Sequence, residues 1–188
     1  AGENVVVVTG TASGKTLAYN LPVIQALLTD PEARAIFLFP TKALAQDQAA
    51  GLASFLETLG VEQALPVRIY DGDTPRSQRR AVRDEARLLI TNPDMLHTGI
   101  LPHHPRWAHL FENLNWIVLD EMHTYRGVFG SNVANLMRRV RRLCRFYGSE
   151  PRFALTSATI ANPKELAERL IEAPVHLVSP DLDGSPRA

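Results

Sequence analysis

The sequence contains one cysteine, Cys144, among its 188 residues, and it contains no long apolar run. A single cysteine excludes an intramolecular disulfide and any structural zinc site in this chain that needs two or more thiolates. No segment approaches the ~18 consecutive apolar residues of a membrane span, and the N-terminal residues lack the basic and then apolar pattern of a secretion signal. We therefore expect a soluble cytoplasmic protein with no zinc in this chain and no membrane partner.

An excess of charge is also absent, because 20 Lys and Arg residues balance 20 Asp and Glu residues. The zero sum hides an uneven distribution along the chain. Residues 1–75 carry 4 basic and 8 acidic side chains, residues 76–152 carry 13 and 7, and residues 153–188 carry 3 and 5. The basic middle keeps a polyanion such as nucleic acid open as a partner, although the total charge alone argues against one.

Short β-rich apolar runs alternate with longer segments of helical periodicity, which is typical of an α/β fold with a mostly parallel sheet covered by helices on both faces. At this length one domain can bury a substantial core without disulfides. The predicted strands are Val5–Val8, Ala35–Phe39, Val67–Tyr70, Arg87–Thr91, Trp116–Asp120, Phe153–Ser157 and Val175–Val178. The predicted helices cover about 15–29, 42–59, 75–84, 93–98, 131–147 and 163–172.

Two helix ends and one domain boundary are also predicted. Ser131 is the expected N-cap of the helix at 131–147, and Gly148 is its expected C-terminal stop. Residues 179–188 are rich in Pro, Asp, Gly and Ser, which indicates a linker. We expect one domain over residues 1–178, followed by this linker.

A phosphate-binding loop follows the first predicted strand. A loop of small residues between a strand and a helix directs several backbone N–H groups into one concavity at the positive end of the helix, which suits a nucleotide phosphate. Lys15 is expected to reach the β- and γ-phosphates, and the Thr16 hydroxyl is expected to bind Mg²⁺. Thr9 stands where the strict pattern has glycine. The expected nucleotide-binding residues are Thr9, Gly10, Thr11, Ala12, Ser13, Gly14, Lys15 and Thr16.

Two adjacent carboxylates, Asp120 and Glu121, follow the apolar run that begins at Trp116. Ligands of open α/β sheets bind at the carboxyl ends of the strands, so this pair complements the phosphate loop. Asp120 is expected to contact Mg²⁺ together with Thr16. Glu121 is expected to orient and deprotonate the water that attacks the γ-phosphate. Lys15, Asp120 and Glu121 are therefore the predicted catalytic residues, with ATP and Mg²⁺ as the cofactors.

The carboxylates continue as Asp120-Glu121-Met122-His123, and Ser157-Ala158-Thr159 comes at the end of the next strand. The two segments resemble motifs II and III of the superfamily 2 DExH-box helicases. Phe39-Pro40-Thr41-Lys42-Ala43-Leu44-Ala45-Gln46-Asp47-Gln48 resembles motif Ia, and Thr91-Asn92-Pro93-Asp94-Met95-Leu96 resembles motif Ib. The resemblance covers about residues 5–163. It implies a three-layer RecA-like P-loop NTPase domain, the first of two such motor domains.

Two loops resemble one branch of that superfamily, the bacterial mitomycin repair factor A type with its fungal and archaeal relatives. They are Tyr70-Asp71-Gly72-Asp73-Thr74-Pro75 and His123-Thr124-Tyr125-Arg126-Gly127-Val128-Phe129-Gly130-Ser131. The branch implies an ATP-dependent 3′-to-5′ DNA helicase in DNA repair, associated with the bacterial nucleoid. It also implies a zinc-binding C-terminal domain, which this chain does not contain.

The resemblance further implies roles for individual residues. Those expected to contact the sugar-phosphate backbone of single-stranded nucleic acid, most naturally DNA, are Thr41, Lys42, Thr91 and Asn92. The residues expected to relay the state of the γ-phosphate to the nucleic-acid-binding surface and to the partner domain are His123, Ser157 and Thr159. Independently of the resemblance, the glycine-flanked loop just after the carboxylates suggests a further DNA contact, with Arg126 on a phosphate and Tyr125 or Phe129 stacked on a base. Simpler readings remain open: Thr41 and Asp94 as local caps, His123 as a buried core histidine, and the loop around Arg126 as an interface with the second motor domain.

Other functions fit the sequence less well. A phosphate-loop GTPase needs an Asn-Lys-x-Asp box, and the sequence contains none. A kinase needs an arginine-bearing lid, and no segment after the core has that form. Neither class explains Ser157-Ala158-Thr159. A non-catalytic nucleic-acid-binding or scaffold domain derived from a helicase is the alternative to a motor. Since the adenine-binding segment and the second motor domain's arginine finger are expected outside this chain, we expect it alone to bind Mg²⁺-nucleotide weakly and to show almost no DNA-stimulated ATPase.

Overall fold

The computed structural model describes residues 3–9 and 15–179, and for Lys15 it describes the main chain only. Within this part of the chain one sheet has the strand order β3-β4-β2-β5-β6-β1-β7, and every pairing is parallel. The strands are β1 (Asn4–Val8), β2 (Arg34–Leu38), β3 (Val67–Ile69), β4 (Leu88–Thr91), β5 (Leu114–Leu119), β6 (Arg152–Ser157) and β7 (Val175–Val178). All seven predicted strands are confirmed, with their ends shifted by one or two residues.

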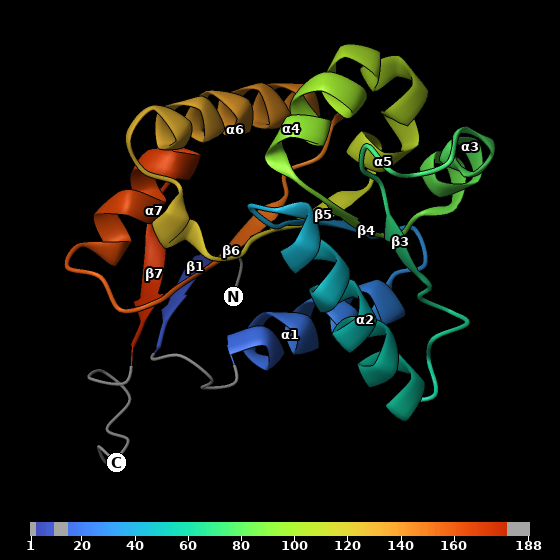
Figure 1. Ribbon diagram of the computed structural model, residues 1–188, viewed down its shortest axis with the longest axis horizontal. Coiled ribbons are helices and arrows are strands. Elements are labelled where there is room, and N and C mark those ends of the chain that lie inside the picture. The colour runs from blue at the N-terminus through green and yellow to red at the C-terminus, as the bar shows by residue number, and fades with distance from the viewer. Residues whose placement is uncertain (1–2, 10–14, 180–188) are drawn as a thin grey trace.

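Helices cover both faces of this sheet (Figure 1). One face carries α1 (Lys15–Thr29) and α2 (Lys42–Thr58). The other carries α3 (Arg76–Glu85), α4 (Pro93–Met95), α5 (Ala108–Glu112), α6 (Gly127–Tyr147) and α7 (Pro163–Ile171). The predicted three-layer RecA-like architecture is therefore confirmed.

Each face has its own apolar core, because successive side chains of a strand point to opposite faces. In β2, Ile36 and Leu38 belong to the core beneath α6, while Ala35 and Phe37 belong to the core beneath α1 and α2. All four side chains are at most 1% exposed. Burial on both faces explains why this strand reads as a continuous apolar run in the sequence.

The prediction for the start of α6 was wrong. The helix begins at Gly127, with Arg126 as an extended N-cap, and Ser131 lies one turn inside, where its hydroxyl donates to the Gly127 carbonyl at 3.2 Å. The first turn extends beyond the core, so Val128 and Phe129 are exposed and the apolar periodicity of the buried face starts only at Val133. The C-terminal stop is confirmed, because Gly148 has φ +86°.

A second difference concerns residues 99–112, which were not predicted to be helical. A π-helical turn at Leu96–Ile100 and a 3₁₀ segment at Leu101–Trp107 connect α4 to α5. Pro102 and Pro105 lie in these short helical turns, whose apolar side chains are buried. Those side chains are Leu101, Trp107, Leu110 and Phe111. Tertiary burial overrides local propensity in this segment.

Candidate functional site

The strand order divides the carboxyl edge of the sheet into two halves. Neighbouring strands β3, β4 and β2 lead into the loop after Tyr70, motif Ib and motif Ia, respectively. Neighbouring strands β5, β6 and β1 lead into the carboxylates, motif III and the phosphate loop. The residues expected to bind nucleotide therefore lie side by side, and most of those expected to bind nucleic acid lie next to them across the β2–β5 boundary.

Asp120 is held by Thr156 at the centre of the nucleotide half. The side chain of Asp120 is 5% exposed, and the fully buried Thr156 hydroxyl donates a hydrogen bond to its carboxylate. Strand register explains the meeting, because Leu119 pairs with Leu155 and the next residues are Asp120 and Thr156. The sequence analysis did not select Thr156. Its signal was a hydroxyl side chain at the end of a buried strand, which becomes meaningful only once β5 and β6 are known to be neighbours.

Glu121 takes a left-handed backbone conformation, with φ +52°. This conformation is uncommon for a residue other than glycine, so it needs support from its surroundings. The Glu121 N–H donates to the Thr156 hydroxyl at 3.3 Å, and the Glu121 carbonyl accepts from the Thr124 N–H at 2.9 Å. The chain thus turns sharply after β5, and this turn separates the directions of the Asp120 and Glu121 side chains.

His123 lies between the carboxylates and motif III. Its Nδ1 atom is 3.3 Å from the Ala158 N–H and 3.1 Å from a Glu121 carboxylate oxygen. Nδ1 without a proton accepts from Ala158, whereas Nδ1 with a proton donates to Glu121, so only one of the two bonds exists at a time. The ring is half-buried rather than a core histidine, with 29% of its side chain exposed. This geometry physically joins motif II to motif III.

The other two residues expected to couple the motifs lie in different surroundings. Ser157 is buried, and its hydroxyl donates to the Ala158 carbonyl at 2.7 Å. Thr159 is exposed and lines a surface cavity. The hydroxyl of Thr156, which directly precedes motif III, donates to Asp120.

The phosphate loop lies largely outside the described residues. Residues 10–14 and the Lys15 side chain are in that part, so the expected contacts of Gly10, Thr11, Ala12, Ser13, Gly14 and Lys15 are not described. Thr9 is described, and its N–H donates to the Ser157 carbonyl at 3.5 Å. Helix α1 starts at Lys15, as predicted, with Thr16 half-buried in its first turn. The ends of β1 and β6 therefore bring Thr9 next to the start of motif III.

Burial and the neighbouring carboxylates together raise two tyrosine pKa values. The pKa of the Tyr19 phenol in α1 lies well above its usual value, first because of burial and then because of the Asp120 and Glu121 charges. The pKa of Tyr125 is raised by the same causes in the same order. The Tyr19 shift places the first turns of α1 near Asp120. A carboxylate and the Thr16 hydroxyl are oxygen donors of the kind that Mg²⁺ prefers, so these residues fit the expected Mg²⁺-nucleotide.

On the nucleic-acid half, motif Ia is tied to the loop after β3. Thr41 is exposed and caps α2, with its hydroxyl accepting from the Leu44 N–H at 3.3 Å. The Lys42 ammonium donates to both carboxylate oxygens of Asp73 at 3.1 Å. Both partners are exposed, so the ion pair is weak and Lys42 remains accessible to an anion. Thr41 therefore has the predicted capping role, and its exposure leaves the expected strand contact open.

The motif Ib residues are less accessible than expected. Thr91 is fully buried, and its hydroxyl donates to the Tyr70 carbonyl at 2.6 Å. Asn92 is 7% exposed, and its side-chain oxygen caps α4 by accepting from the Met95 N–H at 2.9 Å. A strand contact through the Thr91 side chain is therefore contradicted. The hydroxyl was selected because it follows a strand end, but it is used to link β4 to β3.

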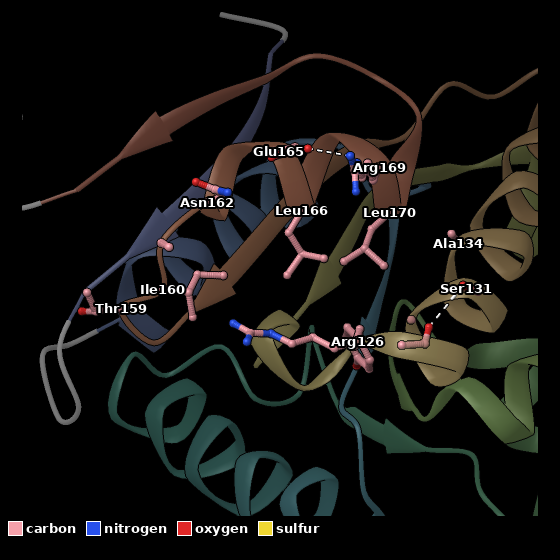
Figure 2. Close-up of a pocket in the computed structure, with 14 residues that line it drawn as sticks. Arg126, Ser131, Ala134, Thr159, Ile160, Asn162, Glu165, Leu166, Arg169 and Leu170 are labelled. Carbon is pink, nitrogen blue, oxygen red and sulfur yellow. Dashed lines mark hydrogen bonds and ion pairs between the residues drawn. The ribbon is translucent and has the colours of Figure 1, made fainter.

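Arg126 lies on the nucleotide half, apart from Thr41 and Lys42. It lines a cavity of about 810 Å³ between the start of α6, the residues after motif III and α7. Figure 2 shows the Arg126 side chain extending across this cavity toward Ile160. Tyr125 is fully buried, so the expectation that it stacks on a base was wrong. Phe129 remains exposed and lies on a different face of α6.

Among the described residues, no group of three or more His, Cys, Asp and Glu side chains is arranged to hold a metal ion. No helix in that part of the chain is long and apolar enough to cross a membrane.

Comparison with protein families gives a match over most of the chain. A family model described as "DEAD/DEAH box helicase" matches residues 1–166. The chain is 58% identical over 185 residues to the uncharacterized ATP-dependent helicase YprA of Bacillus subtilis, covering 98% of this chain and 24% of that protein. It is 48% identical over 164 residues to the ATP-dependent helicase HRQ1 of Saccharomyces cerevisiae, covering 86% of this chain and 15% of that protein.

Solved structures agree with these matches. The crystal structure of the DUF1998 helicase MrfA bound to DNA superimposes with a TM-score of 0.91 and 58% identity, over 95% of this chain and 25% of that chain. The RNA-bound DEAD-box protein Mss116p, at 18% identity and a TM-score of 0.75 over 94% of this chain and 36% of that chain, shares the fold. The chain thus spans about a quarter or less of the length of the curated relatives given above.

Proposed function

The chain belongs to the DEAD/DEAH box helicase family, and we propose that it is the ATP-binding motor domain of an ATP-dependent DNA helicase or translocase. The parent protein couples Mg²⁺-ATP hydrolysis to movement along single-stranded nucleic acid. The observation that carries the proposal is the arrangement at the end of β5, where Thr156 holds Asp120 and supports the turn at Glu121, beside the helix that begins at Lys15.

In this proposal the chain's own residues divide the work of phosphoryl transfer. Thr16 and Asp120 hold the metal, and Lys15 binds the β- and γ-phosphates. Mg²⁺ held there would supply positive charge against the phosphate oxygens. Glu121 orients the attacking water and accepts its proton. Positioning and charge neutralisation carry the reaction, because phosphoryl transfer needs little covalent help from the protein.

His123 supplies the connection between hydrolysis and movement. A Glu121 side chain that turns toward a water on the γ-phosphate gives up its contact with the Nδ1 atom of His123. Exchange with solvent then moves the ring proton from Nδ1 to Nε2, so that Nδ1 accepts from the Ala158 N–H and ties the carboxylates to motif III. The state of the nucleotide thereby reaches Thr159, which is exposed at the edge of the motif III cavity.

The nucleic-acid strand lies over the half of the carboxyl edge that β3, β4 and β2 form. Thr41 and Lys42 contact its sugar-phosphate backbone, and the motif Ib segment around Asn92 contributes through its main chain. Arg126, which extends into the cavity beside motif III, faces the second RecA-like domain of the parent protein instead. DNA is the proposed nucleic acid because MrfA, 58% identical to this chain, was crystallised bound to DNA.

The biological setting follows from the same relatives. We propose that the parent protein acts in DNA repair, in the cytoplasm and at the nucleoid of a bacterium, as the resemblance to the mitomycin repair branch suggests. A non-catalytic scaffold domain is the alternative. The chain retains Lys15 and Glu121, the residues that a domain without hydrolytic activity has no reason to keep, and this favours the motor.

The test uses the full-length parent protein with Lys15→Ala and Glu121→Gln variants. Lys15→Ala is expected to weaken ATP binding, and Glu121→Gln is expected to retain binding while losing strand-stimulated hydrolysis by about 10³-fold or more. Helicase activity should be lost in both. Parental hydrolysis in both variants would exclude a motor that uses this site and leave the scaffold role.

A further inference from the structure

A small groove lies on a face of α6 that the proposed function does not use. It has a volume of about 280 Å³ and separates α4 and the following turn from the first three turns of α6. Its aromatic wall is Phe129, so we call it the Phe129 groove. Helix positions 129, 132 and 136 line it, whereas positions 127, 130 and 134 line the cavity that contains Arg126. The two hollows are therefore separate sites on the same helix.

Phe129 presents an open aromatic surface to this groove. Its ring is 39% exposed, although one side contacts the buried Tyr125 ring with centroids 5.5 Å apart at a tilt of 58°. Pro93 forms part of the opposite wall and is buried. An aromatic ring held on one side and open on the other can stack on a planar ligand at little cost in side-chain entropy.

The polar side chains of the groove include two without a hydrogen-bond partner among the described residues. These are Asp94 and Asn132, both exposed. The other charged and polar groups each have at least one partner: Arg139 donates through one nitrogen to the Nδ1 atom of His97 at 2.6 Å, and the side-chain oxygen of Asn135 accepts from Arg138 at 2.7 Å. The groove thus offers one carboxylate and one amide for hydrogen bonds beside an aromatic wall.

This chemistry fits a neutral planar ring with exocyclic amino groups better than it fits an anion. The Asp94 carboxylate and the Arg139 guanidinium balance each other, so the groove has no excess positive charge to attract a phosphate, while carboxylates accept hydrogen bonds from the amino groups of cytosine and other bases. The volume is near the lower end of ligand pockets, which begin at about 300 Å³, so a single ring system fits better than a whole nucleotide. Pro93 and Asp94 of the groove directly follow Asn92 in sequence, so the groove lies next to the proposed path of the nucleic-acid strand.

We propose that the Phe129 groove binds one base of the single strand, stacked on Phe129 and hydrogen-bonded to Asp94 and Asn132. The inference rests on the proposed function, since it needs a strand on this edge of the sheet. The backbone contacts around Lys42 then hold the strand without regard to sequence, and the groove adds a contact that favours bases bearing an amino group. Base–aromatic stacking of this kind also resists sliding of the strand between steps.

The experiment measures binding of an oligodeoxycytidylate and of an abasic strand of equal length, by fluorescence anisotropy at fixed salt. The variants are Phe129→Leu, which keeps apolar volume against Tyr125, and Asp94→Ala with Asn132→Ala, which alters exposed side chains only. Val128→Ala is the matched control, because Val128 is 80% exposed, precedes Phe129 and lies outside the groove. Phe129→Tyr tests rescue by another aromatic ring.

Phe129→Leu is expected to lower affinity for the oligodeoxycytidylate by about tenfold and to leave affinity for the abasic strand unchanged. Phe129→Tyr and Val128→Ala should bind like the chain without substitutions. The Asp94→Ala, Asn132→Ala double variant should have a smaller preference for cytosine over thymine.

An equal loss for both strands, or no loss for either, would overturn the inference; the second outcome would indicate a protein partner for this groove. Lys42→Ala separates this failure from failure of the proposed function. If Lys42→Ala weakens binding of both oligonucleotides while Phe129→Leu weakens binding of neither, only the proposed base site is wrong. If neither variant changes binding, or the parent chain binds neither strand, the proposed strand path fails as well.

Discussion

At the scale of single residues, Thr156 is the side chain on which the nucleotide site most depends without touching nucleotide. Thr156→Val keeps the side-chain shape but removes the hydroxyl that donates to Asp120 and accepts from the Glu121 N–H. Substitution of a residue that is hydrogen-bonded to a metal ligand changes metal affinity or activity by about 10–100-fold. We therefore expect the full-length protein with Thr156→Val to need correspondingly more Mg²⁺ for hydrolysis. Titration of ATPase activity with Mg²⁺ measures this effect.

Thr29→Val is the control for that substitution. The Thr29 hydroxyl also donates to another group, the Gln25 carbonyl at 2.8 Å, but it is exposed at the end of α1. Its loss should leave the Mg²⁺ dependence unchanged. An unchanged Mg²⁺ dependence in Thr156→Val would show that the Asp120–Thr156 bond is structural only.

The lone cysteine gives a second prediction for a single residue. Burial raises the pKa of the Cys144 thiol to about 11, and the side chain is 1% exposed. Because the thiolate is the reactive form, iodoacetamide at pH 8 should modify the folded chain far more slowly than the urea-unfolded chain. A folded-state pKa above the ordinary value means that the neutral thiol favours folding, and this contribution is lost as the pH rises toward 11. Equal labelling rates in the two states would contradict the burial.

At the scale of elements, the junction between the loop after β5 and α6 depends on a glycine. A Cβ atom on Gly130 would lie 2.4 Å from the Tyr125 carbonyl oxygen, whereas a Cβ on Gly51 in α2 would meet nothing within 4 Å. Gly130→Ala should therefore destabilise the fold by about 1–3 kcal/mol, and Gly51→Ala should stabilise it by about 0.5–1 kcal/mol. Urea denaturation of the two variants gives both values. Stabilisation by both would mean that the loop does not rest against α6 as described.

The ion pair between α2 and the loop after β3 yields a prediction about nucleic-acid binding. Asp73→Asn removes the carboxylate that engages Lys42, so the lysine is left free for phosphate and the affinity for single strands should rise. Lys42→Ala should lower the affinity and reduce the slope of log K against log salt by about one. Fluorescence anisotropy at several salt concentrations measures both. A slope that Lys42→Ala leaves unchanged would remove Lys42 from the strand contact.

The elements also show where sequence reasoning succeeds and fails. The strands were predictable because β2 and its neighbours are buried on both faces and read as uninterrupted apolar runs. The start of α6 was not, because its first turn projects past the core and lacks the periodicity of the rest. The segment 99–112 was missed because prolines suggest a loop, while burial of Trp107 and Phe111 decides the outcome.

The same division applies to the site. The place of Asp120 and Glu121 at the carboxyl edge of the sheet was predictable, because the apolar run from Trp116 identifies a buried strand that ends there. Thr156 was not, because its role depends on strand order, which no local pattern reveals. Thr91 was selected for its place after a strand, but that place leaves the side chain buried against β3.

At the scale of the whole molecule, the proposed function places two ligands on the carboxyl edge of one sheet. The strand order gives nucleotide the β5, β6 and β1 half and nucleic acid the β3, β4 and β2 half. His123 and motif III lie within the nucleotide half and reach the exposed Thr159, so in the proposed function a change at Glu121 is passed to the surface that would face the rest of the parent protein. The uneven charge along the sequence therefore matters less than the placement of a few side chains along this edge.

The central claim is that Asp120 holds Mg²⁺ for a nucleotide bound at the start of α1. Binding of a non-hydrolysable ATP analogue to this chain, followed by NMR with and without Mg²⁺, tests it most directly when the parent chain is compared with Asp120→Asn. We predict that Mg²⁺ tightens binding to the parent chain and that Asp120→Asn removes this dependence while leaving the fold intact. Analogue binding that does not depend on Mg²⁺ in the unsubstituted chain, or that keeps its full Mg²⁺ dependence in Asp120→Asn, would contradict the account.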